Sequence, residues 1–251
     1  MKTNEREERI LAILKQQQFA SVRQLAATLY ISPSSIRRDL TRLERAGLVE
    51  RSYGGVILRG NLHTAAPFLI RSEQNRQCKK EIAARAAALL HDHMTVLIDD
   101  STTAYFLLEH LTAHTGISVI TNNLVTALHA IELSLSTYMI GGTSTNRSTV
   151  MCGSYALGML DQIYADICFF SSFALSDDGE ISDCTEEANT VRKKMLSRAG
   201  TRVFLCDSSK FHTHAAHRLC SLREVEYVFS DQPVPGWEPD DEPPSPRQAR
   251  R

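Results

Sequence analysis

Apolar residues recur every three to four positions in three stretches near the N-terminus, and this spacing predicts a helix in each of residues 4–18, 21–31 and 33–46. Ser21 and Ser32 stand where N-caps are expected, and Pro33 occupies a first helical position, where its missing N–H costs nothing. After Gly47, which suits a helix C-cap, an alternating segment, the Gly54-Gly55 turn and residues 56–58 predict a β-hairpin. This order of elements predicts a winged helix-turn-helix domain in residues 1–58.

The third helix has one apolar and one basic face. At 100° per residue, Ile36, Leu40 and Leu43 share the apolar face, and Arg37 falls on the flank of the helix. The opposite face carries Ser34, Ser35, Arg38, Thr41, Arg42 and Arg45. An isolated basic face of this kind is usually only solvated surface. Residues 1–60, however, hold 11 Lys and Arg against 6 Asp and Glu, a net of +5, and the remaining 191 hold 17 against 23, a net of −6. A basic unit joined to an acidic one favours a DNA-binding head.

The rest of the chain alternates between strands and helices. Strands are predicted at 95–99, 117–121, 137–142, 165–171, 201–207 and 225–231, and helices at 79–90, 101–111, 123–133, 154–163 and 186–200. Such alternation predicts an α/β domain with a parallel sheet in residues 79–232. Residues 59–78 break the periodicity and are expected to be a linker. Six of the eight prolines lie between positions 233 and 246, so we expect residues 233–251 to be disordered, with Trp237 docked.

Polar side chains follow several of the predicted strands. They are Asp99, Asp100, Ser101, Thr102 and Thr103, then Thr121, Asn122 and Asn123, then Gly141 and Gly142, and finally Asp207, Ser208, Ser209 and Lys210. Any one of these turns is most simply explained by N-capping. Because open α/β sheets bind ligands at the carboxyl ends of their strands, four such turns favour a binding site, with hydroxyl and N–H groups for a phosphate and carboxylates for sugar hydroxyls. The first strand lacks a following G-x-G-x-x-G, which argues against a dinucleotide.

The stretch SVRQLAATLYISPSSIRRDLTRLERAGLVERSYGGVIL resembles the head of the DeoR family of bacterial transcriptional regulators. The shared pattern is S-x-x-x-[IV]-R-R-D-L-x-x-L-E-x-x-G-L-[VI]-x-R-x-[YH]-G-G. The resemblance implies an α+β winged helix-turn-helix head joined to an α/β Rossmann-like domain with a mostly parallel sheet, similar to phosphosugar isomerases. The residues that it implies for DNA contact are Ser34, Ser35, Arg37, Arg38 and Arg42 in the helix, and Arg51 and Tyr53 in the wing.

The resemblance extends to the second domain, from Pro67 to Asp231. It implies effector-binding roles for Asp99, Thr102, Thr103, Thr121, Asn122, Gly141, Gly142, Glu187, Lys193, Asp207 and Lys210, with Gly153 and Ser209 also matching family positions. Three departures stand out. Ser101 replaces a family glycine and follows Asp100, a second carboxylate that would repel a phosphate unless it turned away. The strand end at 169–172 lacks its usual glycine, and the family's further helix and strand after Asp231 are replaced by the proline-rich tail.

Two functions of different classes remain open. The first is a sequence-specific regulator, in this family most often a repressor of sugar-metabolism genes, that binds an operator as an oligomer and releases it when a phosphorylated sugar or related metabolite binds. The second is a phosphosugar isomerase with a DNA-binding head, in which Asp99, Glu187, Asp207 and Lys210 would supply acid–base groups. We expect no catalysis, metal or cofactor. With no apolar run of 18 residues and no apolar segment after the charged N-terminus, the protein is expected in the cytoplasm, with its six cysteines reduced.

Overall fold

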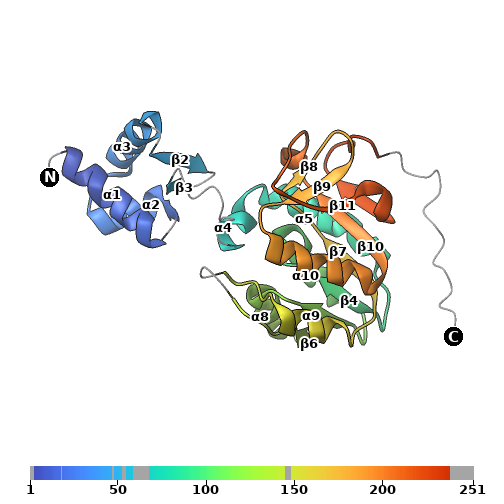
Figure 1. Cartoon of the computed structure of the whole chain (residues 1–251). Coiled ribbons are helices and arrows are strands. Elements are labelled where there is room, and N and C mark those ends of the chain that lie inside the picture. The colour runs from blue at the N-terminus through green and yellow to red at the C-terminus, as the bar shows by residue number, and fades with distance from the viewer. Residues whose placement is uncertain are drawn as a thin grey trace. The chain divides into compact units, whose positions relative to one another are not determined.

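The computed structural model describes residues 3–17, 19–46, 48–52, 55–58, 68–144 and 148–237. The chain divides into two compact units (Figure 1). The first comprises Met1–Gln77 with Ser144–Val150, and the second comprises Cys78–Thr143 with Met151–Arg251. We refer to the helices and hairpin of the first unit as the head and, after the effector-binding role that the resemblance implies, to the second as the sensor unit.

The head contains the three predicted helices and the predicted hairpin. The helices are α1 (Thr3–Gln17), α2 (Val22–Leu29) and α3 (Pro33–Arg45), and the hairpin strands are β2 (Val49–Ser52) and β3 (Gly55–Leu58). Ser21 caps α2 in a capping box with Gln24, and the Ser32 side chain accepts a hydrogen bond from the Ser35 N–H at the start of α3. Gly47 and Gly54 lie outside the described residues. A strand that was not predicted, β1 (Phe19–Ser21), completes an antiparallel sheet of order β1-β3-β2.

One small hydrophobic core holds the head together. All three helices contribute, and strands β2 and β3 add Val49 and Val56. The buried helical members are Ile10, Leu14, Leu25, Ala26, Ile36, Leu40 and Leu43. The wing is therefore anchored in the same core that covers the apolar face of α3, as the sequence pattern requires.

Two helices occupy part of the stretch predicted to be a linker. Helix α4 spans Phe68–Glu73, and α5 spans Arg76–Ala86, so α5 begins three residues before the predicted start at Lys79. Residues 59–67 of that stretch lie outside the described residues.

The sensor unit is built on a six-stranded sheet of order β12-β10-β7-β4-β5-β6, in which every neighbouring pair is parallel. The strands are β4 (Thr95–Ile98), β5 (Ser118–Thr121), β6 (Ser136–Met139), β7 (Ala165–Phe170), β10 (Ala199–Cys206) and β12 (Tyr227–Ser230). From β4 the chain builds outward through β5 to β6, returns to the other side of β4 as β7, and continues to β10 and β12. This doubly wound order confirms the predicted Rossmann-like sheet and places its switch point between β4 and β7.

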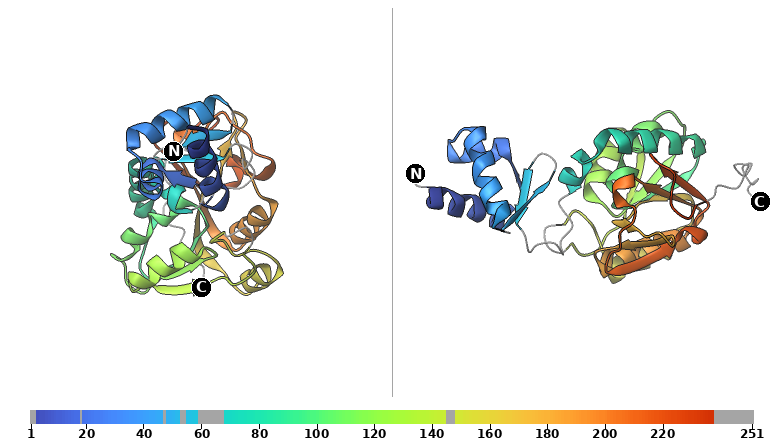
Figure 2. Two further views of the ribbon diagram at one scale, coloured as in Figure 1. Left: turned by 90° about the vertical axis from the view of Figure 1, so that its left-hand side faces the viewer. Right: turned by 90° about the horizontal axis from the view of Figure 1, so that it is seen from above.

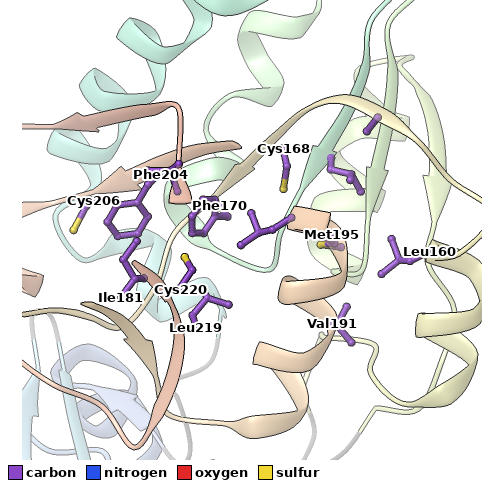
Figure 3. Packing of buried hydrophobic residues seen from close by; sticks show 14 of the residues in the cluster. Leu160, Cys168, Phe170, Ile181, Val191, Met195, Phe204, Cys206, Leu219 and Cys220 are labelled. Carbon is purple, nitrogen blue, oxygen red and sulfur yellow. The ribbon is translucent and has the colours of Figure 1, made fainter. Parts of the chain in front are cut away.

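Helices cover both faces of the sheet (Figure 2). On one face, residues of α5, α7 (Leu108–Leu111) and α8 (Leu124–Glu132) pack on the side chains of Val96, Ile98 and Phe169. On the other face, α9 (Ser154–Leu160) and α10 (Glu186–Ser197) cover Phe170 and Phe204, as Figure 3 shows for α10. The predicted helix at 101–111 is divided into α6 (Thr102–Tyr105) and α7. Single 3₁₀ turns occur at Ala87–Leu89, Ser208–Lys210 and Leu222–Glu224.

A second, antiparallel sheet was not predicted. It has the order β11-β9-β8 and consists of β8 (Ala174–Leu175), β9 (Glu180–Asp183) and β11 (His217–Ser221). Its residues Ile181, Leu219 and Cys220 pack toward Phe170 and Phe204 of the main sheet (Figure 3). The sheet also positions Asp183 for the site described below.

Trp237 docks on the core of the sensor unit, as predicted, and Val234 packs beside it. Residues 238–251 of the tail lie outside the described residues. All six cysteines are free thiols, and three of them, Cys168, Cys206 and Cys220, are buried. In the described part of the chain, no helix has the length and apolar character needed to cross a membrane.

Candidate DNA-binding face and effector site

The first turns of α3 present serines and arginines to solvent. The Ser32 hydroxyl lies 3.0 Å from those of both Ser34 and Ser35, and Arg38 Nη2 donates to Ser35 Oγ at 3.4 Å. Ser34 and Arg38 are exposed, and so is Arg37, which geometry alone had placed on the flank. The N-terminal half of α3 therefore offers hydroxyl and guanidinium donors outward, where a recognition helix contacts base edges and phosphates.

Arg42 faces α1. Its Nε donates to Glu7 Oε1 at 2.7 Å, and its Nη2 contacts the carboxylate of Asp39, which is completely buried. Arg6 also binds Asp39, with Nη2 donating to Oδ1 at 2.6 Å. The hydrogen bond to Glu7 is the main reason that the pKa of Arg42 is raised. Arg42, which sequence geometry placed on the basic face, thus joins α3 to α1 through a buried carboxylate that the sequence analysis did not single out.

The two wing residues implied by the resemblance are only partly described. Arg51 lies in β2 opposite Val56 of β3. Its side chain and the whole of Tyr53 lie outside the described residues. Their contact with DNA stays a prediction.

Asp99 lies at the switch point of the main sheet, directly after β4. Its carboxylate accepts hydrogen bonds from the backbone N–H groups of Ser101 (3.0 Å) and Ser171 (3.2 Å) and from Arg192 Nε (2.8 Å). Ser171 follows β7, so Asp99 joins the two strands between which the winding reverses. Burial raises the pKa of Asp99, and the charge of Arg192 opposes that effect. Enclosed by donors on both sides, Asp99 fixes the two loops in place.

Arg192 of α10 is the centre of this site. Besides Asp99, it binds Asp100 (Nη2–Oδ1, 2.6 Å) and Asp183 (Nη1–Oδ2, 2.9 Å), and its side chain is almost entirely buried. Burial works against its charge, but the three carboxylates raise the pKa of Arg192 well above its ordinary value. Asp100, whose charge was expected to repel a phosphate, is therefore neutralised by an ion pair.

Lys193, a predicted effector residue, is exposed on the outer side of α10. Its neighbour Arg192 is the basic residue of this helix that reaches the strand ends. Glu187 is also exposed, near the start of α10. Its charge acts on Cys152, whose pKa is raised to about 11, first by burial and then by Asp100 and Glu187. Glu187 therefore lies on the side of α10 that faces the loop before α9.

Two lysines supply the remaining positive charge at the strand ends. Lys210 Nζ donates to Ser171 Oγ at 2.7 Å and lies 3.7 Å from Asp207 Oδ2. Lys79 of α5, which the sequence analysis treated only as part of a helix, is buried and donates to Thr102 Oγ1 at 3.1 Å. The structure thus brings the predicted residues Asp99, Thr102, Asp207 and Lys210 to one edge of the sheet and adds Lys79, Arg192 and Asp183 to them.

Two buried polar atoms lie beside this cluster. Within the described part of the chain, Thr103 Oγ1 and Asn122 Oδ1 have no hydrogen-bond partner. Asn122 follows β5 and donates through Nδ2 to the Met151 carbonyl at 3.1 Å, and Thr121, the last residue of β5, is buried. Because unsatisfied buried oxygen atoms are costly, such atoms at a strand-end edge favour a site that receives donors from a ligand or water.

The glycines after β6 shape the neighbouring loop. A Cβ at Gly142, whose φ is +153°, would lie 2.4 Å from the Cys152 carbonyl oxygen, so this position requires glycine. Thr143 and Cys152 pair through backbone hydrogen bonds of 2.9 and 3.0 Å, which close the loop. Gly153 takes φ +91° as it begins α9, and the Gly141 N–H approaches Met159 Sδ at 3.2 Å. These predicted residues therefore form the backbone of a wall near Asn122.

Comparison with known proteins identifies both units. Residues 6–60 match the DeoR-like helix-turn-helix domain, and residues 74–232 match the DeoR C-terminal sensor domain. The chain belongs to the DeoR family. The resemblance drawn from the head motif is confirmed.

Relatives of this DeoR-family chain are named as transcriptional repressors and activators. It is 30% identical to the transcriptional repressor GlcR of Bacillus subtilis, over 90% of this chain and 88% of that one. It is 28% identical to the L-fucose operon activator of Haemophilus influenzae (92% and 93%), and 25% identical to the glycerol-3-phosphate regulon repressor of Escherichia coli (94% and 93%). A solved structure of a D-ribose-5-phosphate isomerase aligns at 19% identity and a TM-score of 0.42 over 54% of each chain, and no conclusion about activity rests on it.

These matches decide between the two classes of function. Both units of the chain fall within a family of DNA-binding transcriptional regulators, and its relatives over nearly the whole length are operon repressors and activators. The chain is a DNA-binding transcriptional regulator, and the isomerase alternative is not supported. The contacts of Asp99 with Arg192 and two backbone N–H groups agree with a non-catalytic role. A carboxylate that already accepts these hydrogen bonds is poorly placed to accept a proton from a substrate.

Proposed function

We propose that this regulator represses genes of sugar metabolism by holding an operator through α3 and the wing, and that it leaves the operator when a phosphorylated sugar or related metabolite binds at the β4–β7 switch point. Two heads on one palindromic operator would require an oligomer. The observation that carries the proposal is the cluster at the strand ends, where Lys79 and Lys210 stand among hydroxyl groups and unpartnered buried oxygen atoms.

For DNA, the proposal assigns direct contact to Ser34, Ser35, Arg37 and Arg38. Their exposure on the first turns of α3 and the net charge of +5 in residues 1–60 support this assignment. Arg42 has a different role in the proposal, because Glu7 and Asp39 already bind its guanidinium. It holds α3 on α1 and reaches a phosphate only with the part of its side chain that stays exposed.

For the effector, the proposal assigns the phosphate to Lys210 and Lys79 with the hydroxyls of Ser171 and Thr102. Lys210 is partly exposed and binds Ser171 Oγ, a neutral partner that an anion can displace or join. Arg192 has no such freedom, since three carboxylates hold it. Its part is to neutralise Asp100, so that a second negative group can approach the loop after β4. The sugar hydroxyls then face Asp207, Asn122 and Thr103.

The test measures operator binding and effector-dependent release in separate steps. An operator is first selected from random duplex DNA with the wild-type protein, and release is then measured with glycerol 3-phosphate, glucose 6-phosphate, fructose 1-phosphate and ribose 5-phosphate, each beside its unphosphorylated counterpart and inorganic phosphate. Lys210→Ala should bind the operator as wild type does and lose the release, because coupling between two sites need not change DNA affinity without effector. Lys193→Ala, a lysine on the exposed side of α10, is the matched control and should release normally.

Retention of the wild-type response by Lys210→Ala, at the same concentration of the active compound, would remove Lys210 from the site. Release by an unphosphorylated sugar alone would overturn the phosphate part of the proposal and leave the DNA part standing.

A further inference from the structure

Tyr30 ends helix α2 in a backbone conformation that favours glycine. Its φ is 56° and its ψ is 45°. The Tyr30 N–H donates to the Ala27 carbonyl at 3.3 Å, and the Ile31 N–H donates to the Ala26 carbonyl at 3.0 Å. This pair of bonds is the Schellman motif, in which the left-handed residue is usually glycine because a Cβ atom crowds the following carbonyl. Tyrosine is therefore an unfavourable residue for folding at this position.

The Tyr30 ring makes little contact with the head that would offset this conformation. It is 94% exposed, the highest value among the exposed large apolar residues in the described part of the chain. Its neighbours Leu29 and Ile31 pack against the core of the head, so they hold the turn on both sides of Tyr30. Single exposed apolar residues are common. A residue that is both strained and almost fully exposed favours a role outside the folded head.

The turn that holds Tyr30 lies next to the part of α3 that is assigned to DNA. Tyr30 stands two positions before Ser32, the N-cap of α3, and the exposed residues Ser34 and Arg38 follow on the first turns of that helix. When a helix-turn-helix binds DNA, the N-terminal residues of the second helix contact base edges in the major groove, while the first helix crosses the backbone. The turn between the two helices then lies where groove and backbone meet, so phosphates are the groups closest to Tyr30.

We infer that Tyr30 donates its phenolic hydroxyl to a phosphate of the operator backbone. Tyrosine carries an O–H donor at the end of a rigid ring, and it is one of the side chains that contact phosphates in protein–DNA complexes. With two side-chain torsions, it also loses little conformational entropy when it is ordered. The inference rests on the proposed docking of α3 and adds a residue of the turn to those that the proposed function assigns to DNA.

The hydroxyl contact differs from the arginine contacts of α3 in two measurable ways. The phenol is neutral, so its hydrogen bond to a phosphate adds affinity without the counterion release that a guanidinium brings. A phosphate contact also carries no direct sequence information. Tyr30 would instead fix the orientation of α3 in the groove, because Leu29 and Ile31 anchor the turn from which its side chain extends.

The decisive variant is Tyr30→Phe, which keeps the ring and removes the hydroxyl. Operator affinity of the full-length protein is measured at several salt concentrations and on operators with single base changes. Tyr30→Phe should bind about 10-fold more weakly per bound head, because a hydrogen bond to a charged group is lost. Its salt slope and its base preference should equal those of the wild type. Arg38→Ala is the reference for an altered slope or preference, and Tyr164→Phe, which changes an exposed tyrosine of the sensor unit, should bind normally.

Tyr30→Gly tests the backbone argument. Glycine adopts the left-handed conformation freely, so the variant should keep the turn and unfold at a urea concentration no lower than that of the wild type, as followed by circular dichroism. Its operator affinity should fall at least as far as that of Tyr30→Phe, since the whole side chain is removed. A variant that folds better and binds DNA worse would show that Tyr30 serves binding and not folding.

Normal operator affinity of Tyr30→Phe would overturn the inference, and so would a changed base preference or a salt slope lowered by about 1. A marked fall in the urea midpoint of Tyr30→Gly would also overturn it, because the tyrosine would then be required for folding. The reference variant separates this inference from the proposed function. If Arg38→Ala weakens binding and Tyr30→Phe does not, only the role of Tyr30 fails. If neither variant weakens binding, the proposed docking of α3 fails with it.

Discussion

The head and the sensor unit each contain a network of ion pairs around a buried charged residue, and the central residues of the two networks have opposite charges. In the head, the buried carboxylate of Asp39 is held by Arg6 and Arg42. In the sensor unit, the buried guanidinium of Arg192 is held by Asp99, Asp100 and Asp183. Both networks tie together elements distant in sequence, yet they differ in solvent exposure. The partners of Asp39 reach solvent, whereas most of the sensor network is enclosed.

This difference follows from what each unit has to bind. The head must present cations to DNA, and an enclosed anion lets it keep arginines near α3 while joining that helix to α1. Under the proposed function, the sensor unit admits an anionic effector to a strand edge rich in carboxylates, and the enclosed cation lowers the repulsion there. Because a charge removed from water depends strongly on its partners, we expect loss of one partner to be more destabilising in the enclosed network than in the exposed one.

The largest effect is expected from Arg192→Met. Removing this cation leaves three carboxylates near one another with no counter-charge, which should lower the free energy of unfolding of the sensor unit by about 3–5 kcal/mol. Trp237 is the single tryptophan of the chain and packs on the sensor core, so its fluorescence during urea unfolding follows that unit selectively. Lys193→Met, the neighbouring exposed position on α10, is the control and should change stability by less than about 0.5 kcal/mol.

If the Arg192 variant unfolds at the wild-type urea concentration, the three carboxylates have other means of neutralisation, such as bound protons. Repeating the measurement at higher pH distinguishes that case, because loss of those protons restores the repulsion between the carboxylates and the variant should then become less stable than the wild type.

A smaller effect is expected from Asp39→Asn in the head. The amide keeps the shape but loses the charge that Arg6 and Arg42 share, which should lower the stability of the head by about 1–3 kcal/mol. Circular dichroism should show the loss, whereas the Trp237 fluorescence transition should stay unchanged because it reports the other unit. A shift of both transitions would contradict the independence of the two networks.

Arg38 and Arg42 provide the sharpest comparison within the head. Arg38→Ala should leave folding unchanged and weaken operator binding, by about 1–3 kcal/mol at one base pair if it contacts guanine, or with a salt slope reduced by about 1 if it contacts phosphate. Arg42→Ala should lower the urea midpoint of the head and leave base-pair preference unchanged, because its guanidinium is already bound by Glu7 and Asp39. Affinity and stability are measured on the same preparations. An Arg42 variant with altered base preference and normal stability would reverse the two assignments.

The sequence was sufficient to predict most of the fold because the elements obey strong local rules. Ser21 and Ser32 cap the helices predicted from them, and alternation of strand and helix determines the parallel sheet. The strands β8, β9 and β11 were not predicted because they are short, and because β11 pairs with a distant strand through a register shift between Arg218 and Cys220. Strand β1, with three residues, carries too little periodicity to be recognised.

The positions of residues that follow strands could be predicted from the sequence. Which side a helical residue faces could not. The sequence predicted that Asp99, Thr102 and Asp207 lie close together because all parallel strands end at one edge. The sequence analysis named Lys193 and not Arg192. A displacement of one residue on a helix turns the side chain by 100°, here from the buried side, where Arg192 lies, to the exposed side, where Lys193 lies. Buried lysine is rare, so nothing in the sequence distinguished Lys79 from the other residues of its predicted helix. Asp39 was not singled out because buried carboxylates are also rare, and because its partner on α1, Arg6, lies 33 positions away.

The smallest expected effect concerns the C-terminal segment of the sensor unit. Trp237 is half-buried on the core beside Val234. The backbone N–H of Trp237 donates to the Val234 carbonyl at 3.2 Å. Trp237→Ala should therefore lower the stability of the sensor unit by about 1 kcal/mol, less than the 3–5 kcal/mol typical of a fully buried tryptophan, because only part of the ring leaves contact. Deletion of residues 238–251 should change stability by less than about 0.5 kcal/mol, since that proline-rich and charged composition buries little apolar area. Urea unfolding followed by circular dichroism applies to both variants, because the first removes the fluorophore. Neither change should alter operator affinity, which belongs to the head. A deletion that destabilises as much as Trp237→Ala would show that residues beyond Trp237 also pack on the sensor core.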